Sequence, residues 1–233
     1  MRIRITFTKQ GPLRYTGHLD LHKLWERAAR RAALPLAYSQ GFHPQPKMNI
    51  AAALPLGFSS ICEVLDMRIK QEIPLDGLAQ RLQDTLPAGI RILNIERVDD
   101  SQPALQTQVA SAEYEVTLTE SMDRFELERK IASVMESASL PRERRGKSYD
   151  LRPLIEELNV LESNSLLLEQ APGLQKIFMR LSAREGATGR PEEVLDVLGI
   201  AFEGTRIERT KLHFNLAKVG ESTQSVSQPN LQD

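Results

Sequence analysis

The first hundred residues alternate between two hydrophobic periods, and this order constrains the fold more than any other feature of the chain. Residues 2–9 place Ile3, Ile5 and Phe7 at every second position, which is typical of a half-buried strand. Residues 19–33 place apolar side chains three and four positions apart, as on one face of a helix. The same reasoning predicts a helix at 75–86 and strands at 36–38 with 47–53, at 61–69 and at 90–98. The predicted order is β-α-β-β-α-β, the ferredoxin-like arrangement, an α+β fold with helices on one face of an antiparallel sheet.

The rest of the chain repeats this order less regularly. We expect strands at 114–119, 166–168, 176–181 and 206–214, helices at 122–137 and 191–198, and an additional basic strand-then-helix segment at 141–161. The predicted organisation is a basic ferredoxin-like domain (1–100), a linker (101–111), a second, irregular ferredoxin-like domain (112–217) and a disordered tail (218–233).

The net charge of −1 conceals a strong asymmetry along the chain. Residues 1–58 carry nine Lys and Arg against two acidic residues, a balance of +7, and the remainder carries −8. Such a basic segment indicates a polyanionic partner, with nucleic acid first. The alternative interpretation is a basic helix face that is merely solvated.

The single cysteine, Cys62, excludes an intrachain disulfide and any cysteine-rich zinc or iron–sulfur site built by this chain alone. His18 and His22 are four residues apart, but the zinc-protease pattern lacks its Glu, so we expect neither a metal nor another cofactor. No stretch approaches the roughly 18 apolar residues of a membrane span. The first residues read as a strand and not as a signal peptide, so we expect a cytoplasmic protein.

Aromatic and cationic side chains interleave in two regions, a combination that suits single-stranded RNA because rings stack on bases and cations bind phosphates. The alternative is that Tyr38 and Phe42 belong to the core. The predicted nucleic-acid-binding residues are Arg14, Tyr15, Lys23, Arg27, Arg30, Arg31, Tyr38, Phe42, His43 and Lys47 in the first region, and Arg144, Arg145, Lys147 and Arg152 in the second.

Three residues could carry catalysis if the chain is an enzyme. His18 and His43 would form an acid/base pair, because imidazole titrates near neutral pH. Asp150, which a nearby arginine would keep ionised, would be a nucleophile, although a plain ion pair is the safer interpretation of this residue. Paired ferredoxin-like domains also build pseudouridine synthases and CRISPR RNA endonucleases, so a stand-alone RNA-modifying or RNA-cleaving enzyme is one alternative, by fold analogy alone.

Several short motifs resemble those of a known family. They are Phe7, Lys9 and Gly11; Arg14-Tyr15; His18-Leu19-Asp20; Tyr38-Ser39-Gln40-Gly41-Phe42 through Pro46-Lys47; Leu54-Pro55-Leu56-Gly57 with Ser60, Glu63 and Asp66; and the segment Lys147–Pro153. On these residues the chain resembles the radical SAM-linked protein family, a domain of unknown function. Gly17 and Asn49-Ile50 depart from the pattern, since that family usually has serine and serine–phenylalanine there.

The resemblance implies a partner, because members of that family are typically fused to, or encoded beside, a radical SAM enzyme and often lie near RNA-processing genes. This chain lacks the CxxxCxxC motif, so the iron–sulfur cluster would belong to the partner. Our leading hypothesis is therefore a non-catalytic auxiliary module that binds RNA or a ribonucleoprotein and presents it to a separate radical SAM enzyme. A third hypothesis, a protein–protein adaptor, predicts an apolar patch beside the cations of the first half.

Overall fold

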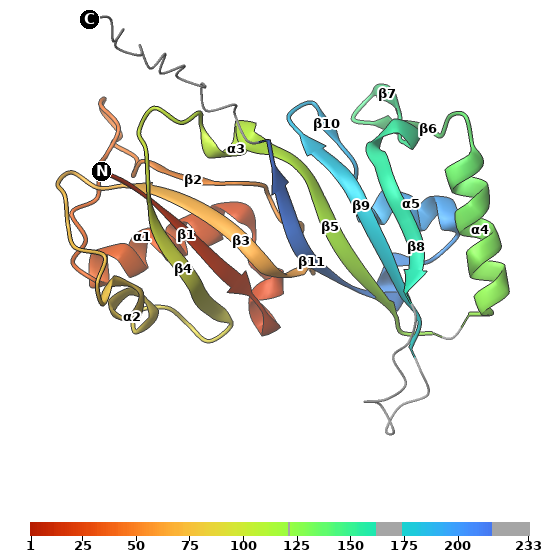
Figure 1. Ribbon diagram of the computed structural model, residues 1–233, viewed down its shortest axis with the longest axis horizontal. Coiled ribbons are helices and arrows are strands. Elements are labelled where there is room, and N and C mark those ends of the chain that lie inside the picture. Colours follow the sequence, from red (N-terminus) through yellow and green to blue (C-terminus); the bar gives the residue numbers. More distant parts are fainter. Residues whose placement is uncertain (121, 162–173, 216–233) are drawn as a thin grey trace, which may run out of the picture.

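The computed structural model describes residues 1–120, 122–161 and 174–215, and the first half forms the predicted α+β unit (Figure 1). Its elements in chain order are β1 (Arg2–Lys9), the 3-10 helix η1 (Gly11–Tyr15), α1 (His18–Arg31), β2 (Met48–Ile50), β3 (Ser59–Arg68), α2 (Leu78–Gln83) and β4 (Ile90–Val98). The strands lie in the order β4-β1-β3-β2, and every pair is antiparallel. This is the ferredoxin-like order, so the predicted fold class is confirmed for this unit.

Alternation along β1 explains why α1 packs where it does. Ile3, Ile5 and Phe7 are fully buried and face the helix. Trp25 of α1 is fully buried against them, with its ring edge-on to Phe7 at 4.8 Å between centroids. Such aromatic pairs add about 0.5–1.5 kcal/mol beyond the area they bury.

Two elements of this half are shorter in the structure than predicted. Residues 36–38 form only isolated bridges, from Leu36 to Ile69 and from Tyr38 to Pro46, because the prolines that flank this segment cannot donate to a ladder. The predicted helix 75–86 is limited to α2, because Gly77 at its start adopts a left-handed conformation with φ of 71°.

The second half repeats the topology with insertions. Its elements are α3 (Leu105–Gln108), β5 (Val109–Leu118), α4 (Arg124–Glu136), β6 (Pro141–Arg144), β7 (Lys147–Asp150), η2 (Arg152–Leu154), β8 (Ile155–Leu161), β9 (Lys176–Arg184), β10 (Ala187–Thr188), α5 (Pro191–Leu198), η3 (Phe202–Gly204) and β11 (Thr205–Phe214). The order β8-β9-β5-β11 is again fully antiparallel and ferredoxin-like. Both halves therefore share one arrangement, as the sequence order predicts.

The segment 141–161 differs from its prediction. It forms the β6–β7 hairpin, η2 and β8, and contains no α-helix. β8 takes the place of the second strand of the unit, and the predicted strand 166–168 and tail 218–233 lie outside the described residues. Ile155 and Leu158 are three residues apart, which is a helical spacing, but a register shift between Ile155 and Glu157 allows both to be buried in a strand. The predicted linker 101–111 holds α3 and the beginning of β5.

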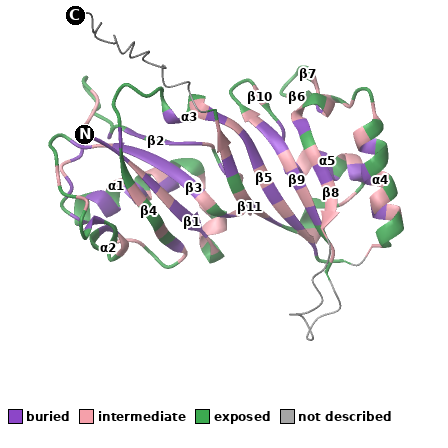
Figure 2. Cartoon of the chain, in the orientation of Figure 1, coloured by how far each residue is buried: buried purple, intermediate pink, exposed green. Residues whose placement is uncertain are grey.

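One sheet connects the two halves, because β11 pairs in parallel with β3. At this seam the guanidinium of Arg209 makes a bidentate ion pair with Glu63, and each side chain is only 1% exposed. Buried residues follow β1, β3, β5 and β9 through the middle of the molecule (Figure 2). Helices α1 and α5 lie behind the sheet on the same face (Figure 1). Within the described ranges, no helix is long and apolar enough to cross a membrane.

Candidate nucleic-acid interface

The β6–β7 hairpin turns at Arg145-Gly146, where both residues have positive φ, 49° and 73°. Two consecutive positive φ values are the signature of the type I′ turn, whose twist matches that of the flanking strands. Gly146 adopts this conformation without strain, whereas a side chain such as that of Arg145 makes it costly. The tip of the hairpin therefore holds an arginine where the turn prefers Asn, Asp or Gly.

The register of the hairpin gathers its cations on one face. Arg144 pairs with Lys147 and Arg142 with Tyr149, so these four side chains point the same way. The hydroxyl of Tyr149 donates to the Glu193 carboxylate of α5, and Arg142 makes a 2.9 Å ion pair with Asp196. Burial, and then the bond to Glu193, raise the pKa of Tyr149 to about 12. These contacts fix the hairpin to α5.

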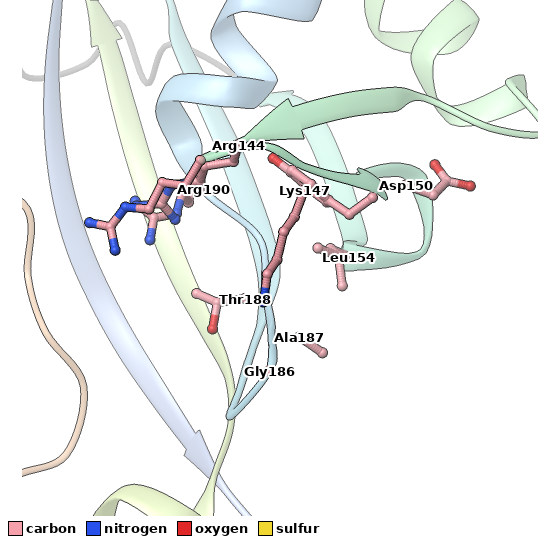
Figure 3. Close-up of a pocket in the computed structure, with 10 residues that line it drawn as sticks. Arg144, Lys147, Asp150, Leu154, Gly186, Ala187, Thr188 and Arg190 are labelled. Carbon is pink, nitrogen blue, oxygen red and sulfur yellow. The ribbon is translucent and has the colours of Figure 1, made fainter.

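Four cations meet at one hollow of about 570 Å³, which we call the basic pocket (Figure 3). Arg144, Arg145 and Lys147 come from the hairpin, and Arg190 comes from the residue before α5. Arg190 lies 3.6 Å from Glu192, whereas the three hairpin cations have no ion-pair partner in the part of the chain that the structure describes. The other lining residues are Tyr149, Asp150, Leu154, Gly186, Ala187 and Thr188. Such a concentration of unpaired guanidinium and ammonium groups suits phosphate.

Asp150 belongs to the opposite face of the hairpin. Its carboxylate points away from Lys147 and Arg144 (Figure 3) and accepts main-chain N–H bonds from Leu140 at 2.7 Å and Arg152 at 3.0 Å. These bonds, that of Leu140 first, lower the pKa of Asp150. The ionised group thus closes a turn, a role that does not favour its use as a nucleophile.

Arg152 has a structural position as well. Its guanidinium donates to the carbonyl oxygens of Met135, in the last turn of α4, and of Ile155, at the start of β8. Because these bonds occupy the group, Arg152 does not belong to the basic pocket.

The predicted cations of α1 lie in a separate region. Arg30 makes a 2.7 Å ion pair with Glu26 and donates to the hydroxyl of Tyr38. Lys23, Arg27 and Arg31 are exposed, Lys23 at 3.9 Å from Asp20. Arg27 and Arg31 line a smaller hollow of about 280 Å³ together with Leu24, Asp84, Thr85, Leu86 and Pro87.

The predicted aromatic contacts divide into exposed and packed residues. Phe42 and Tyr15 are exposed, and the Arg14 guanidinium lies 4.8 Å from the Tyr15 ring. Tyr38 is half-buried against the core of the first unit, which agrees with the alternative that this residue belongs to the core. His43 and Lys47 are exposed.

The structure does not unite the three candidate catalytic residues at the basic pocket. Asp150 lines it, but His18 and His43 do not. Desolvation lowers the pKa of His18, and His22 contacts the Met48 carbonyl through Nε2 at 2.9 Å. Among the described residues, no group of three or more His, Cys, Asp or Glu side chains gathers as metal ligands would.

A second hollow of about 480 Å³, the seam pocket, adjoins the basic pocket and shares Thr188 and Arg190 with it. It lies between the two halves of the chain. Its lining is Ala51–Pro55, Gln106, Tyr114, Ala183, Glu185, Thr188–Pro191 and Arg209. Neither Arg190 nor the seam pocket is evident from the sequence, because both arise from contacts between segments far apart in the chain.

Comparison with known proteins gives a family and a distant structural likeness. The family described as "Uncharacterized protein conserved in bacteria (DUF2344)" matches residues 2–191. No curated protein matches the chain. Among solved structures, a chain of "Crystal Structure of a Cbf5-Nop10-Gar1 Complex" is similar over 90% of this chain with 10% identity and a TM-score of 0.46. The present chain spans about half of that chain, 48% of its length.

Proposed function

The chain belongs to the DUF2344 family of uncharacterized proteins conserved in bacteria, and we propose that it is an auxiliary module that binds RNA or a ribonucleoprotein through the basic pocket. The observation that carries the proposal is the convergence of Arg144, Arg145, Lys147 and Arg190 on one hollow. The hairpin cations lack acidic partners within the described residues, so their charge is available to a ligand.

The geometry favours a polyanion over a small carboxylate. Four positive charges surround the hollow of about 570 Å³, and one carboxylate would neutralise only one of them. The successive phosphates of a nucleic-acid strand supply negative charge at several points. The exposed α1 cations Lys23, Arg27 and Arg31 offer a second contact region for a long strand. Exposed aromatic rings, Tyr15 and Phe42, are suited to stack on unpaired bases.

The second part of the proposal is that the module works with a separate radical SAM enzyme. Its support is the motif resemblance together with the single cysteine, since this chain has too few thiols to hold an iron–sulfur cluster. A cytoplasmic location also stays a prediction from the sequence.

The RNA proposal is tested by fluorescence anisotropy with a labelled single-stranded RNA of about 10 nucleotides, a length within the range of single-strand sites. If four phosphates are neutralised, the logarithm of the binding constant falls against the logarithm of salt with a slope of about −3. Replacing Arg144 and Lys147 with Gln is expected to weaken binding and to reduce that slope to about −1.5.

The matched control replaces two exposed cations elsewhere, Arg81 of α2 and Arg129 of α4, with Gln. It makes the same change in net charge and is expected to leave most of the affinity and slope intact. Absence of binding at about 50 mM salt, salt-insensitive binding, or equal losses in both double variants contradicts the proposal.

The partner is tested by isolating the tagged protein anaerobically from its host and identifying bound protein and RNA together. Recovery of a radical SAM enzyme with RNA supports both parts of the proposal. Recovery of RNA without such an enzyme supports the first part and contradicts the second.

A second candidate function, the protein–protein adaptor, has one specific observation in its favour. Leu19 and Leu56 are 74% and 59% exposed. Gly57 donates its main-chain N–H to the Arg14 carbonyl, and a Cβ added at Gly17 would lie 3.9 Å from the Leu56 side chain, so Leu56 lies next to the segment that carries Arg14 and Leu19. Replacing both leucines with Ser is expected to abolish partner binding without changing RNA affinity if this patch is an adaptor surface.

A further inference from the structure

We propose that the seam pocket receives one unstacked nucleobase of the strand whose phosphates bind the basic pocket. The inference rests on the proposed function and names the part of the ligand that the adjoining site takes. It assigns the seam pocket a role that no motif of the sequence indicates.

The two hollows are adjacent, because Thr188 and Arg190 line both. A nucleotide likewise has a charged part and an uncharged part, because its phosphate is joined through the sugar to an uncharged planar base. Arg190 lies at the boundary between the basic pocket and the seam pocket. A guanidinium in this position can bind a phosphate while its planar face stacks on a base.

The inner end of the seam pocket carries little net charge. Although Arg209 lines it, its guanidinium is neutralised by Glu63 and also donates to the carbonyl oxygens of Ala52 and Ala53. Tyr114, its cross-strand neighbour, is 6% exposed. These bonds hold planar groups in fixed positions and leave no free cation for a phosphate, so this end suits an uncharged ring.

Much of the lining of the seam pocket is small or apolar, which suits a planar ring. The loop that follows β2 supplies Ala51–Pro55, and the segment that leads into α5 supplies Gly189 and Pro191. Gly189 cannot carry a side chain without displacing its neighbours, because an added Cβ would lie 2.9 Å from the Leu154 carbonyl oxygen. The volume of about 480 Å³ lies within the range of small-molecule clefts, roughly 300–1,000 Å³.

Two polar side chains line the pocket and can read the edge of a base. Gln106 and Glu185 have no hydrogen-bond partner among the residues that the structure describes. The amide of Gln106 offers a donor and an acceptor, and the carboxylate of Glu185 accepts from ring and amino N–H groups. Base edges present these same groups.

The test compares two probes on the full chain: the labelled single-stranded RNA and a strand of equal length and charge whose nucleotides lack bases. The wild-type protein is expected to bind the RNA at least about tenfold more tightly than the abasic strand, the scale of one well-stacked base. Ala53→Phe, at an exposed position that lines the seam pocket, is expected to reduce this preference to what the exposed rings of Tyr15 and Phe42 contribute, while abasic binding and its salt slope stay unchanged. Ala132→Phe, at an exposed position of α4, is the matched control and is expected to keep the preference.

Gln106→Ala provides a second test that adds no bulk, and a several-fold loss of the preference is expected. Equal affinity of the wild-type protein for both probes overturns the base pocket and leaves the proposed phosphate site standing. A preference that keeps its wild-type size in both Ala53→Phe and Gln106→Ala overturns it also. Failure of both probes to bind overturns the proposed function and this inference together.

Discussion

The buried ion pair at the seam offers the strongest test of how the two halves are held together. Arg209 donates through Nε and Nη2 to Glu63, with Nη2 to Oε2 at 2.7 Å. Both side chains are 1% exposed, so neither charge is compensated by water. Burial, the largest single effect, lowers the pKa of Arg209, but the charge and hydrogen bonds of Glu63 together with Tyr114 and Cys62 outweigh it, so the pKa of Arg209 is raised.

Replacing Glu63 with Gln leaves that guanidinium buried without a counter-charge. Removing one partner of a buried pair costs about 3–5 kcal/mol, against a total stability of about 5–15 kcal/mol for a typical fold. Lys9 adds to the effect, because this residue is 1% exposed: burial lowers its pKa, and the charge of Glu63 opposes that shift. We therefore expect Glu63→Gln to cost more than Arg209→Met.

The assay is urea unfolding followed by circular dichroism and by the fluorescence of Trp25, which reports on the first unit alone. The double variant Glu63→Leu/Arg209→Met removes both charges and is expected to be more stable than Glu63→Gln, since no unpaired charge remains buried. Single variants that each cost less than about 1 kcal/mol, or a double variant that costs the sum of the two, would refute this account of the seam.

Three further variants test local features. Arg145→Asn is expected to stabilise the protein by about 0.5–1 kcal/mol in urea unfolding, because Asn tolerates positive φ, and to weaken RNA binding in the anisotropy assay; a loss of stability would contradict the turn assignment. Asp150→Asn is expected to destabilise the protein at neutral pH, and the difference from the wild type is expected to shrink as pH falls through the depressed pKa of Asp150, because a lowered folded-state pKa contributes stability only above that pKa. Thermal unfolding against pH measures this difference, and a difference that stays constant would exclude linkage to this carboxylate. Trp25→Phe is expected to cost less than Leu82→Ala, which should lose about 2–5 kcal/mol, because the buried indole N–H has no partner among the described atoms and its removal offsets the lost volume.

Local periodicity was sufficient to predict the elements that bury one face. Strand β1 has the predicted bounds, because its apolar side chains alternate strictly and all of them reach the core. The bounds of α5 are also as predicted, since Pro191 stands in its first turn and Gly199 ends it with φ of 69°. From such elements the order of both units follows, and with it the strand order of the ferredoxin-like arrangement.

Features that depend on distant contacts were beyond prediction. Arg190 reads as an isolated cation in the sequence, and only the docking of the hairpin on α5 places it beside Arg144 and Lys147. Likewise, Arg209 lies in β11 beside a register shift between residues 209 and 211, and nothing near it in sequence shows that Glu63 is its partner. The predicted site residues Arg144, Arg145 and Lys147 come together for a local reason, because a two-residue turn brings them within one hairpin.

Two features of the β6–β7 hairpin each destabilise it. Arg144 and Lys147 are like charges in directly paired positions, which destabilises an antiparallel pair. Arg145 adopts a left-handed conformation that is unfavourable for its side chain. An isolated two-stranded hairpin is marginal in water even without these penalties, and here the contacts of Tyr149 and Arg142 with α5 offset them. Local conflicts that persist because neighbouring structure compensates for them concentrate at functional sites. The unfavourable conformation of Arg145 and the repulsion between Arg144 and Lys147 therefore lie at the tip of the same hairpin, where a bound polyanion would relieve the repulsion that the free protein retains.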